Sequence, residues 1–232
     1  MLQSRPESSC TIRDARYYWN DVIFQVENRL FKIPSHYLVQ HSEIFADTFG
    51  LPQGTQGPEG ISDENPVVLH GITALDFEHL LEIVYPQKIP QDYSAFNKDK
   101  WISVLKLSTM WQLSDIRQLA IEYLQQDAKL DPVERVVLAK SYSISPWLRT
   151  GYLSLVKRVQ SLSAEEAEQI GFKSAIQIYQ LREDALVKQA GNRGYVKYNG
   201  TLTDHDVQAA FDKVFQEEFR LADAASQRYL DA

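Results

Sequence analysis

The segment that begins at Asp21 alternates apolar side chains with a period of two, which is typical of a β-strand. The side chains on one of its faces are those of Val22, Phe24 and Val26. Leu30–Ile33 has the composition of a second short strand, and Glu27–Arg29 between them has the length of a tight turn. These features predict an antiparallel hairpin near the start of the chain.

The period of the apolar residues changes after this hairpin. From Ser35 to Phe49 they recur at steps of three and four, which predicts a helical face. Residues 67–69 predict a third short strand, and Thr73 begins a helix that ends before Pro86. Strands come first and about nine helical segments follow, which is an α+β pattern.

The second half of the chain is predicted to be mostly helical. Asp131-Pro132 and Ser145-Pro146 are helix starts, because proline in the first turn loses no intrahelical hydrogen bond. Ser163 and Glu166 have the spacing of a capping box. Asn199-Gly200 predicts a turn, and the last helix opens at Thr203 and Asp206. Its apolar side is predicted to be core, and consists of Phe211, Phe215 and Phe219 with smaller residues.

Composition narrows the class of protein. The chain has 232 residues, a net charge of −7 and no run of basic residues, so nucleic-acid binding is disfavoured. Its one cysteine, Cys10, excludes an internal disulfide and a multi-cysteine zinc site. The leader, residues 1–16, lacks the apolar stretch of a secretory signal, and no window is long and apolar enough for a membrane span. We therefore expect a soluble intracellular protein of the cytoplasm or nucleus, with a disordered leader.

No motif in the chain predicts catalysis, a cofactor or a metal. Gly191–Gly194 lacks the lysine and hydroxyl residue of a phosphate-binding loop, and the histidines have no ligand spacing. Cys10 lies in a polar tail and is a poor candidate for a nucleophile. We expect a protein that is not an enzyme. An enzyme of unrecognised type in the helical half remains an alternative, and converging polar residues in a deep pocket would favour it.

Residues Asp21–Leu124 resemble a BTB/POZ domain. The motif positions that carry the resemblance are Asp21, Phe31, Leu38, Ser42, Phe45, Phe49 and Tyr85. The order and spacing of these residues, followed by two helices over 101–124, are similar to those of fungal BTB proteins with a helical C-terminal extension. The resemblance implies a BTB/POZ-like domain over residues 17–126, with a small, mainly three-stranded sheet and a helical bundle. Residues 127–232 would be the helical extension.

Two positions depart from the family pattern. In members that recruit corepressors, a basic residue pairs with the strand aspartate, and here that position is Ser35, preceded by Pro34. Members that act as adaptors for cullin ubiquitin ligases tend to carry a hydrophobic-any-Glu motif in the loop that here spans 86–100, which has no glutamate. The resemblance therefore supports a cullin partner only weakly, and a cullin adaptor stays an alternative.

An aromatic cluster, Tyr17, Tyr18 and Trp19, stands just before the first strand. It is either a leader packed on its own domain or a dimer contact, because BTB domains commonly dimerise through this edge and interfaces favour Tyr and Trp. The predicted interface comprises these three residues with Val22 and Phe24. The expected partners are a second copy of the chain and an unidentified protein.

Overall fold

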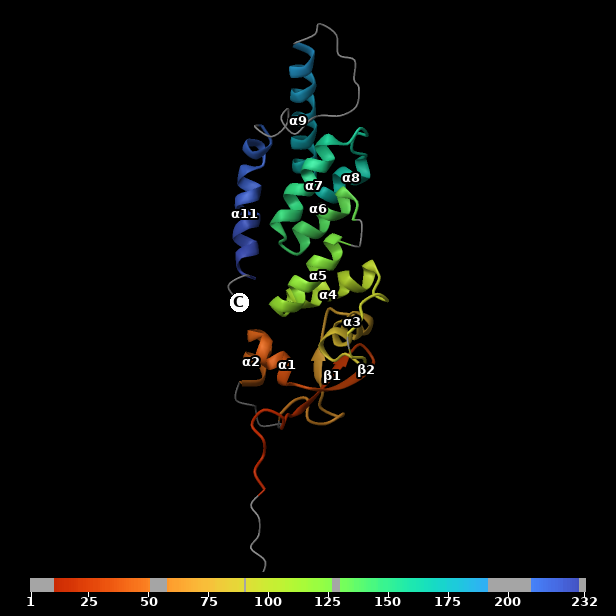
Figure 1. The fold of residues 1–232 in the computed structure, drawn as a ribbon, viewed down its shortest axis with the longest axis vertical. Coiled ribbons are helices and arrows are strands. Elements are labelled where there is room, and N and C mark those ends of the chain that lie inside the picture. The colour runs from red at the N-terminus through yellow and green to blue at the C-terminus, as the bar shows by residue number, and fades with distance from the viewer. Residues whose placement is uncertain (1–10, 51–57, 90, 127–129, 192–209, 230–232) are drawn as a thin grey trace, which may run out of the picture. The chain divides into compact units, whose positions relative to one another are not determined.

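The computed structural model describes residues 11–50, 58–89, 91–126, 130–191 and 210–229, with the backbone alone for 185–191 (Figure 1). The chain divides into two compact units, Met1–Gln87 and Lys88–Ala232. Cys10, the predicted turn at Asn199-Gly200 and the predicted helix start at Thr203 lie outside the described residues. The predicted boundary at residue 126 stays a prediction.

The first unit holds a three-stranded sheet in the order β2-β1-β3. β1 (Asp21–Val26) pairs antiparallel with β2 (Arg29–Pro34) and parallel with β3 (Val67–Leu69). The predicted hairpin is confirmed, with β2 one residue longer at each end than the sequence indicated. Its turn needs only two residues, because Glu27 adopts a positive φ of 55°, as turns that match the twist of a hairpin require.

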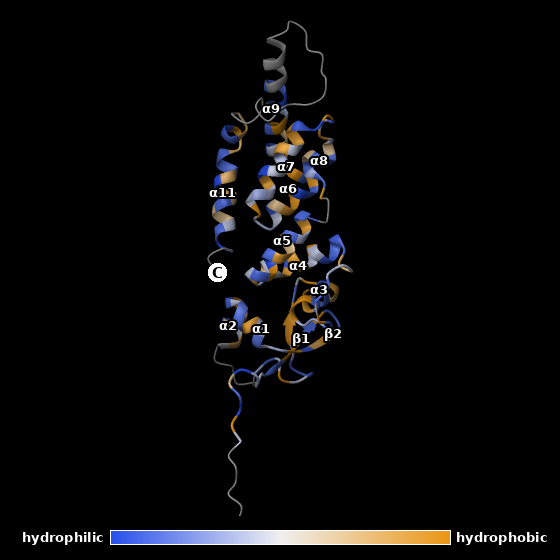
Figure 2. Ribbon diagram, viewed as in Figure 1, coloured by the Kyte–Doolittle hydropathy of each residue, from blue (hydrophilic) through white to orange (hydrophobic). Residues whose placement is uncertain are grey.

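β1 is the centre of this sheet and of its core. Ile23 is buried as well as Val22 and Phe24, so both faces of the strand are covered. Figure 2 shows β1 as an almost wholly apolar strand. A strand that is covered on both faces is typically apolar along its whole length. Between Val22 and Val26 the exception is Gln25, which is only partly buried.

The described residues of the first unit also form the helices α1 (His36–His41), α2 (Glu43–Gly50) and α3 (Ala74–Val84). The prediction of one helical segment over 35–49 is wrong in its continuity, because Ser42 is extended (φ −142°, ψ 114°) and separates α1 from α2. The Ser42 hydroxyl accepts a hydrogen bond from the backbone N–H of Phe45 (3.3 Å), as an N-cap does. The predicted start of α3 is confirmed, since Thr73 accepts from the N–H of Asp76 (3.0 Å).

Aromatic side chains fill the space between the sheet and these helices. The Phe24 ring lies edge-on to the rings of Phe45, Phe49 and Phe77, at centroid distances of 5.9, 6.2 and 5.7 Å. Phe31 extends the cluster, 5.0 Å from Phe77. Edge-to-face geometry at these distances is favourable beyond the area that it buries.

The second unit is helical throughout its described elements. These are α4 (Lys98–Met110), α5 (Ser114–Gln126), α6 (Pro132–Ser141), α7 (Ser145–Lys157), α8 (Ala164–Ile170), α9 (Phe172–Gly191) and α11 (Gln216–Gln227). The predicted caps of α6 and α8 are confirmed: Asp131 accepts from two backbone N–H groups, and Ser163 with Glu166 forms the capping box. Ser145 begins α7 but does not cap it, because its hydroxyl bonds to Asp223 on α11 instead.

Polar contacts join α11 to the helices around it. The Lys140 ammonium lies 3.1 Å from a Glu218 oxygen, which also accepts a hydrogen bond from the Tyr152 hydroxyl (2.7 Å). The guanidinium of Arg149 lies 2.7 Å from Asp223. On the apolar side of this contact the ring of Phe215 stacks on Tyr152 at 4.4 Å. The last helix was predicted to carry core phenylalanines, and Phe211, Phe215 and Phe219 are indeed buried. The helix is not continuous, however, because the backbone leaves the helical conformation at Phe215, just before α11.

A buried arginine from another helix caps the C-terminal end of α7. The Arg182 guanidinium, on α9, donates hydrogen bonds to backbone carbonyls at and just beyond the end of α7, over distances of 2.8 to 3.1 Å. These acceptors are Leu155, Arg158, Val159 and Gln160. The last carbonyls of a helix have no partner within it and carry partial negative charge, so a cation satisfies both needs.

Candidate functional site

Three aromatic side chains ahead of β1 are exposed. The fractional exposures of Tyr17, Tyr18 and Trp19 are 69%, 57% and 46%. We call these three residues the aromatic segment. Its backbone is shaped locally, since Asp14 accepts hydrogen bonds from the N–H groups of Arg16 (2.8 Å) and Tyr17 (3.0 Å). The aromatic segment therefore offers large rings to solvent from an ordered turn.

Trp19 attaches the aromatic segment to the body of the first unit. Its indole stacks on the imidazole of His36 at the start of α1, with centroids 3.9 Å apart and planes 8° apart. The indole N–H donates to the carbonyl of Arg16 (2.7 Å), and the Tyr17 ring lies edge-on to the indole at 6.0 Å. Two arginines cover the outer rings: Arg13 lies 4.7 Å from the Tyr18 centroid, and Arg16 lies 5.5 Å from that of Tyr17.

The other two predicted interface residues lie elsewhere. Val22 and Phe24 are 4% and 0% exposed, because β1 is the central strand and both its faces are covered. Their side chains have no surface to offer a partner while the unit stays folded. The interface stays a prediction, and the aromatic segment is the part of it that is exposed.

The family-motif positions are held by packing and backbone contacts. Phe31, Phe45 and Phe49 belong to the aromatic core, and Leu38 on α1 is fully buried. Ser42 caps α2, as described above. The Tyr85 hydroxyl donates to the carbonyl of Pro34. In this structure the motif residues therefore have structural roles within the first unit.

Asp21 forms an ion pair with Lys32, which the family pattern did not indicate. The Lys32 ammonium lies 3.9 Å from its carboxylate, and both side chains are exposed. Lys32 pairs with Ile23 in the hairpin, so it stands diagonally across from Asp21. Ser35 instead donates its N–H and its hydroxyl to the carbonyl of Asn20, at 2.9 and 3.0 Å. Because residue 35 is a serine, the ion pair that Asp21 forms here is the weak, solvated one with Lys32.

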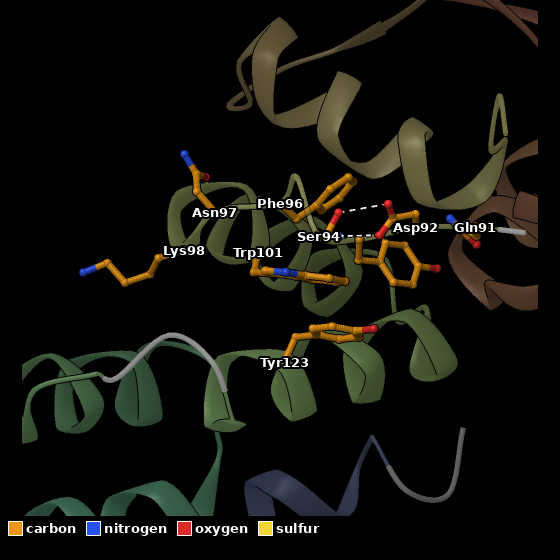
Figure 3. Close-up of a pocket in the computed structure, with 9 residues that line it drawn as sticks. Gln91, Asp92, Ser94, Phe96, Asn97, Lys98, Trp101 and Tyr123 are labelled. Carbon is orange, nitrogen blue, oxygen red and sulfur yellow. Dashed lines mark hydrogen bonds between the residues drawn. The ribbon is translucent and has the colours of Figure 1, made fainter.

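An aromatic pocket of about 580 Å³ opens in the second unit, at the start of α4 (Figure 3). It is lined by Gln91, Asp92, Tyr93, Ser94, Phe96, Asn97, Lys98, Trp101 and Tyr123. The Trp101 indole stacks on the Tyr123 ring at 4.4 Å, and Tyr93 lies edge-on to both rings at 5.3 Å. The pocket thus has a rigid aromatic floor and polar groups at its rim.

The polar rim is ordered by short contacts. Asp92 accepts from the N–H and the hydroxyl of Ser94 (2.8 and 2.9 Å), and these bonds lower the pKa of its carboxyl. Lys98 lies 2.8 Å from Glu134 on α6. Burial raises the pKa of the Tyr93 hydroxyl. The sequence predicts a loop over residues 86–100 and no pocket; the aromatic pair Tyr93 and Phe96 within that loop was the signal for the pocket.

Polar residues also converge in the helical half, around Lys140. Its ammonium donates to the carbonyl of Ile170 (2.6 Å) and the hydroxyl of Ser174 (2.9 Å), and it lies beside Glu218 and Tyr152. Ser174 and Tyr152 are buried, and burial raises the pKa of Tyr152. These groups bond to one another, which is the arrangement of a satisfied structural network.

Two searches of the described residues bear on other kinds of site. They contain no group of three or more His, Cys, Asp or Glu side chains that could hold a metal ion. None of the helices in the described part of the chain is long and apolar enough to cross a membrane.

The model of one protein family matches the chain. It is the BTB/POZ domain, and it covers residues 14–128. The match includes the aromatic segment, the whole sheet, α1 to α5 and the aromatic pocket. A comparison with curated proteins finds no match.

Proposed function

Because this chain is a BTB/POZ domain protein, and such domains are in general protein-interaction modules, we propose that it self-associates through the aromatic segment and also binds a second protein, without catalysis. The observation that carries the first part is the exposure of Tyr17, Tyr18 and Trp19 together, at and just after a turn that Asp14 stabilises. We expect the protein to act inside the cell, in the cytoplasm or nucleus.

Physical chemistry favours the aromatic segment as an interface. Burying a large apolar side chain contributes roughly 1.5–3 kcal/mol, and three such side chains stand together here. The stacking of Trp19 on His36 orders the segment before a partner arrives, which lowers the entropic cost of association. Interfaces are enriched in Tyr and Trp for the same reasons.

The aromatic pocket is the surface that we propose for the second protein. Concave sites with an aromatic floor and a few polar groups are the usual form of binding pockets, and Phe96 and Tyr93 are only partly buried there. The alternative function is a cullin adaptor. The loop over residues 86–100 gives it no specific support, because it lacks the glutamate of the hydrophobic-any-Glu motif. Recovery of a cullin with the purified chain would reverse this ranking.

Light scattering after size exclusion tests self-association. We expect a species of twice the 26.7 kDa chain mass at micromolar concentration. The double variant Tyr17→Ala/Trp19→Ala should be monomeric while its circular dichroism is unchanged. Leu75→Ala is the matched control, since Leu75 is 58% exposed on α3 and outside the aromatic segment. A monomeric wild-type chain, or a double variant that still dimerises, would contradict the proposal.

Affinity purification with mass spectrometry tests the aromatic pocket. Proteins that are recovered reproducibly with the wild-type chain should be lost with Phe96→Ser and kept with Phe172→Ser, which changes a ring that is 65% exposed on α9. Equal recovery with both variants would place the second partner elsewhere.

A further inference from the structure

The charges of the first unit are unevenly distributed along the chain. Residues 33–87 contain no Lys or Arg and eight acidic residues. These are Glu43, Asp47, Glu59, Asp63, Glu64, Asp76, Glu78 and Glu82. The cations of this unit's described residues all lie before residue 33, so its helices carry net negative charge.

Two of those cations are already paired within the unit. Arg29 lies 2.5 Å from Glu78, and Lys32 lies 3.9 Å from Asp21. The guanidinium groups of the other two, Arg13 and Arg16, lie over aromatic rings and form no ion pair with a carboxylate of the described residues, although Asp14 accepts a hydrogen bond from the backbone N–H of Arg16. Both precede the aromatic segment in the sequence and lie over its tyrosines. The segment is therefore a cationic and aromatic surface on a chain whose net charge is −7.

A matching surface exists on α2. Glu43 and Asp47 are four residues apart, so they project from the same side of the helix, and both are exposed. Like charges at this spacing repel, and no cation of the described residues pairs with either carboxylate. Ile44 beside them is 37% exposed. This face of α2 thus offers two carboxylates and an apolar side chain.

We propose that Arg13 and Arg16 of one copy bind Glu43 and Asp47 of a second copy, while the aromatic segment packs on Ile44. Guanidinium–carboxylate pairs are strong and directional, and partial burial by the aromatic rings would strengthen them further. In a two-fold dimer the exchange is reciprocal, so each contact occurs twice. The inference rests on the proposed self-association and names its partner surface.

The charge pattern also explains why a second copy is the favoured occupant. Two chains of net charge −7 repel at long range, so their contact needs a local patch of opposite sign. The arginines supply that patch, and the acidic complement is present on every copy. The contact should therefore weaken with ionic strength, because salt screens charges separated by about 8–10 Å under ordinary conditions.

Charge reversal tests the pairing. The variant Arg13→Glu/Arg16→Glu and the variant Glu43→Arg/Asp47→Arg should each be monomeric at a concentration where the wild type is a dimer. Mixed in equal amounts, they should form a heterodimer, because each reversed surface then meets its complement. Asp63→Arg, an exposed acid outside α2, is the control and should dimerise as the wild type does. For the wild type, the dissociation constant should rise at least about tenfold between low and high salt.

The outcomes separate this inference from the proposed function. If both reversed variants dimerise normally while Tyr17→Ala/Trp19→Ala is monomeric, the aromatic interface stands and the charge pairing is wrong. If both are monomeric and the mixture stays monomeric, α2 is not the partner surface. Only dimerisation restored by mixing supports the inference.

Discussion

The hydroxyl of Tyr85 donates a hydrogen bond to the backbone carbonyl of Pro34, and this bond joins the end of α3 to the last residue of β2. The two residues are 51 positions apart in the chain. Burial raises the pKa of the Tyr85 hydroxyl to about 12. The bond therefore links two segments of the first unit that are far apart in the sequence.

Replacing Tyr85 by Phe should lower the free energy of unfolding by about 1–2 kcal/mol, because the Pro34 carbonyl then loses its partner in a part-buried site. Urea unfolding measures this loss. Tyr18→Phe, at a tyrosine of the same unit that is 57% exposed, should change stability less. An unchanged midpoint for Tyr85→Phe would show that water replaces the bond.

The same tyrosine predicts a loss of stability at alkaline pH. Its pKa rises from 10.0 to about 12 on folding, so the folded state keeps the proton that the unfolded state releases. The Tyr85 contribution is therefore complete below pH 10 and is lost as the pH rises from 10 toward 12. Unfolding midpoints at pH 8 to 11 should fall more steeply for the wild type than for Tyr85→Phe. Parallel curves would contradict this assignment.

Ser42→Ala should cost about 1 kcal/mol of stability, because the N-cap of α2 is lost. Thermal unfolding measures the effect. Gln40→Ala, an exposed change on α1, should be neutral. Ser42→Thr should keep most of the wild-type stability if the capping hydroxyl is responsible, and a Thr variant as unstable as the Ala variant would point to packing instead.

Arg182→Met should destabilise the second unit by roughly 2–4 kcal/mol, since several carbonyls at the end of α7 lose a charged donor. Arg220→Met makes the same chemical change at an exposed arginine that pairs with Glu217, three residues earlier on the same helix. That control should change stability by less than about 0.5 kcal/mol. Denaturant unfolding of both variants gives the comparison, and equal effects would reject the capping role of Arg182.

Phe215→Ala should loosen α11. The ring is fully buried against Tyr152, and removing such a side chain costs about 3–5 kcal/mol. Hydrogen exchange of the α11 amides should therefore accelerate well before the rest of the second unit opens. Leu221→Ala, on the same helix but 54% exposed, should leave that exchange unchanged. Uniform acceleration across the unit would mean that α11 does not open separately.

The sequence predicted the strands and the helix starts well, because these depend on neighbouring residues. The hairpin, β3 and the caps at Thr73, Asp131 and Ser163 all follow from local pattern and composition. Ser42 was the local failure. The helical period continues across it, so the apolar pattern alone does not reveal that the backbone turns there.

The contacts that hold distant elements together were not predictable in this way. The hydroxyl of Ser145 looked like a cap but bonds to Asp223, 78 residues away. Arg182 reaches carbonyls more than twenty residues earlier in the chain, and nothing in its own surroundings marks it as a buried cation. The aromatic segment of the predicted interface was visible from its composition. The burial of Val22 and Phe24 was not, because it depends on β3 and on helices that follow later in the sequence and pack on β1.

Trp19, stacked on His36, is an intrinsic fluorescence probe of the aromatic segment. The chain has four tryptophans, and Trp101, Trp111 and Trp147 are at most 7% exposed, against 46% for Trp19. A collisional quencher such as acrylamide will therefore quench chiefly the fluorescence of Trp19. Replacing the imidazole beside it should alter that emission, and so should covering the indole with another chain. Assembly can thus be followed in solution without any attached dye.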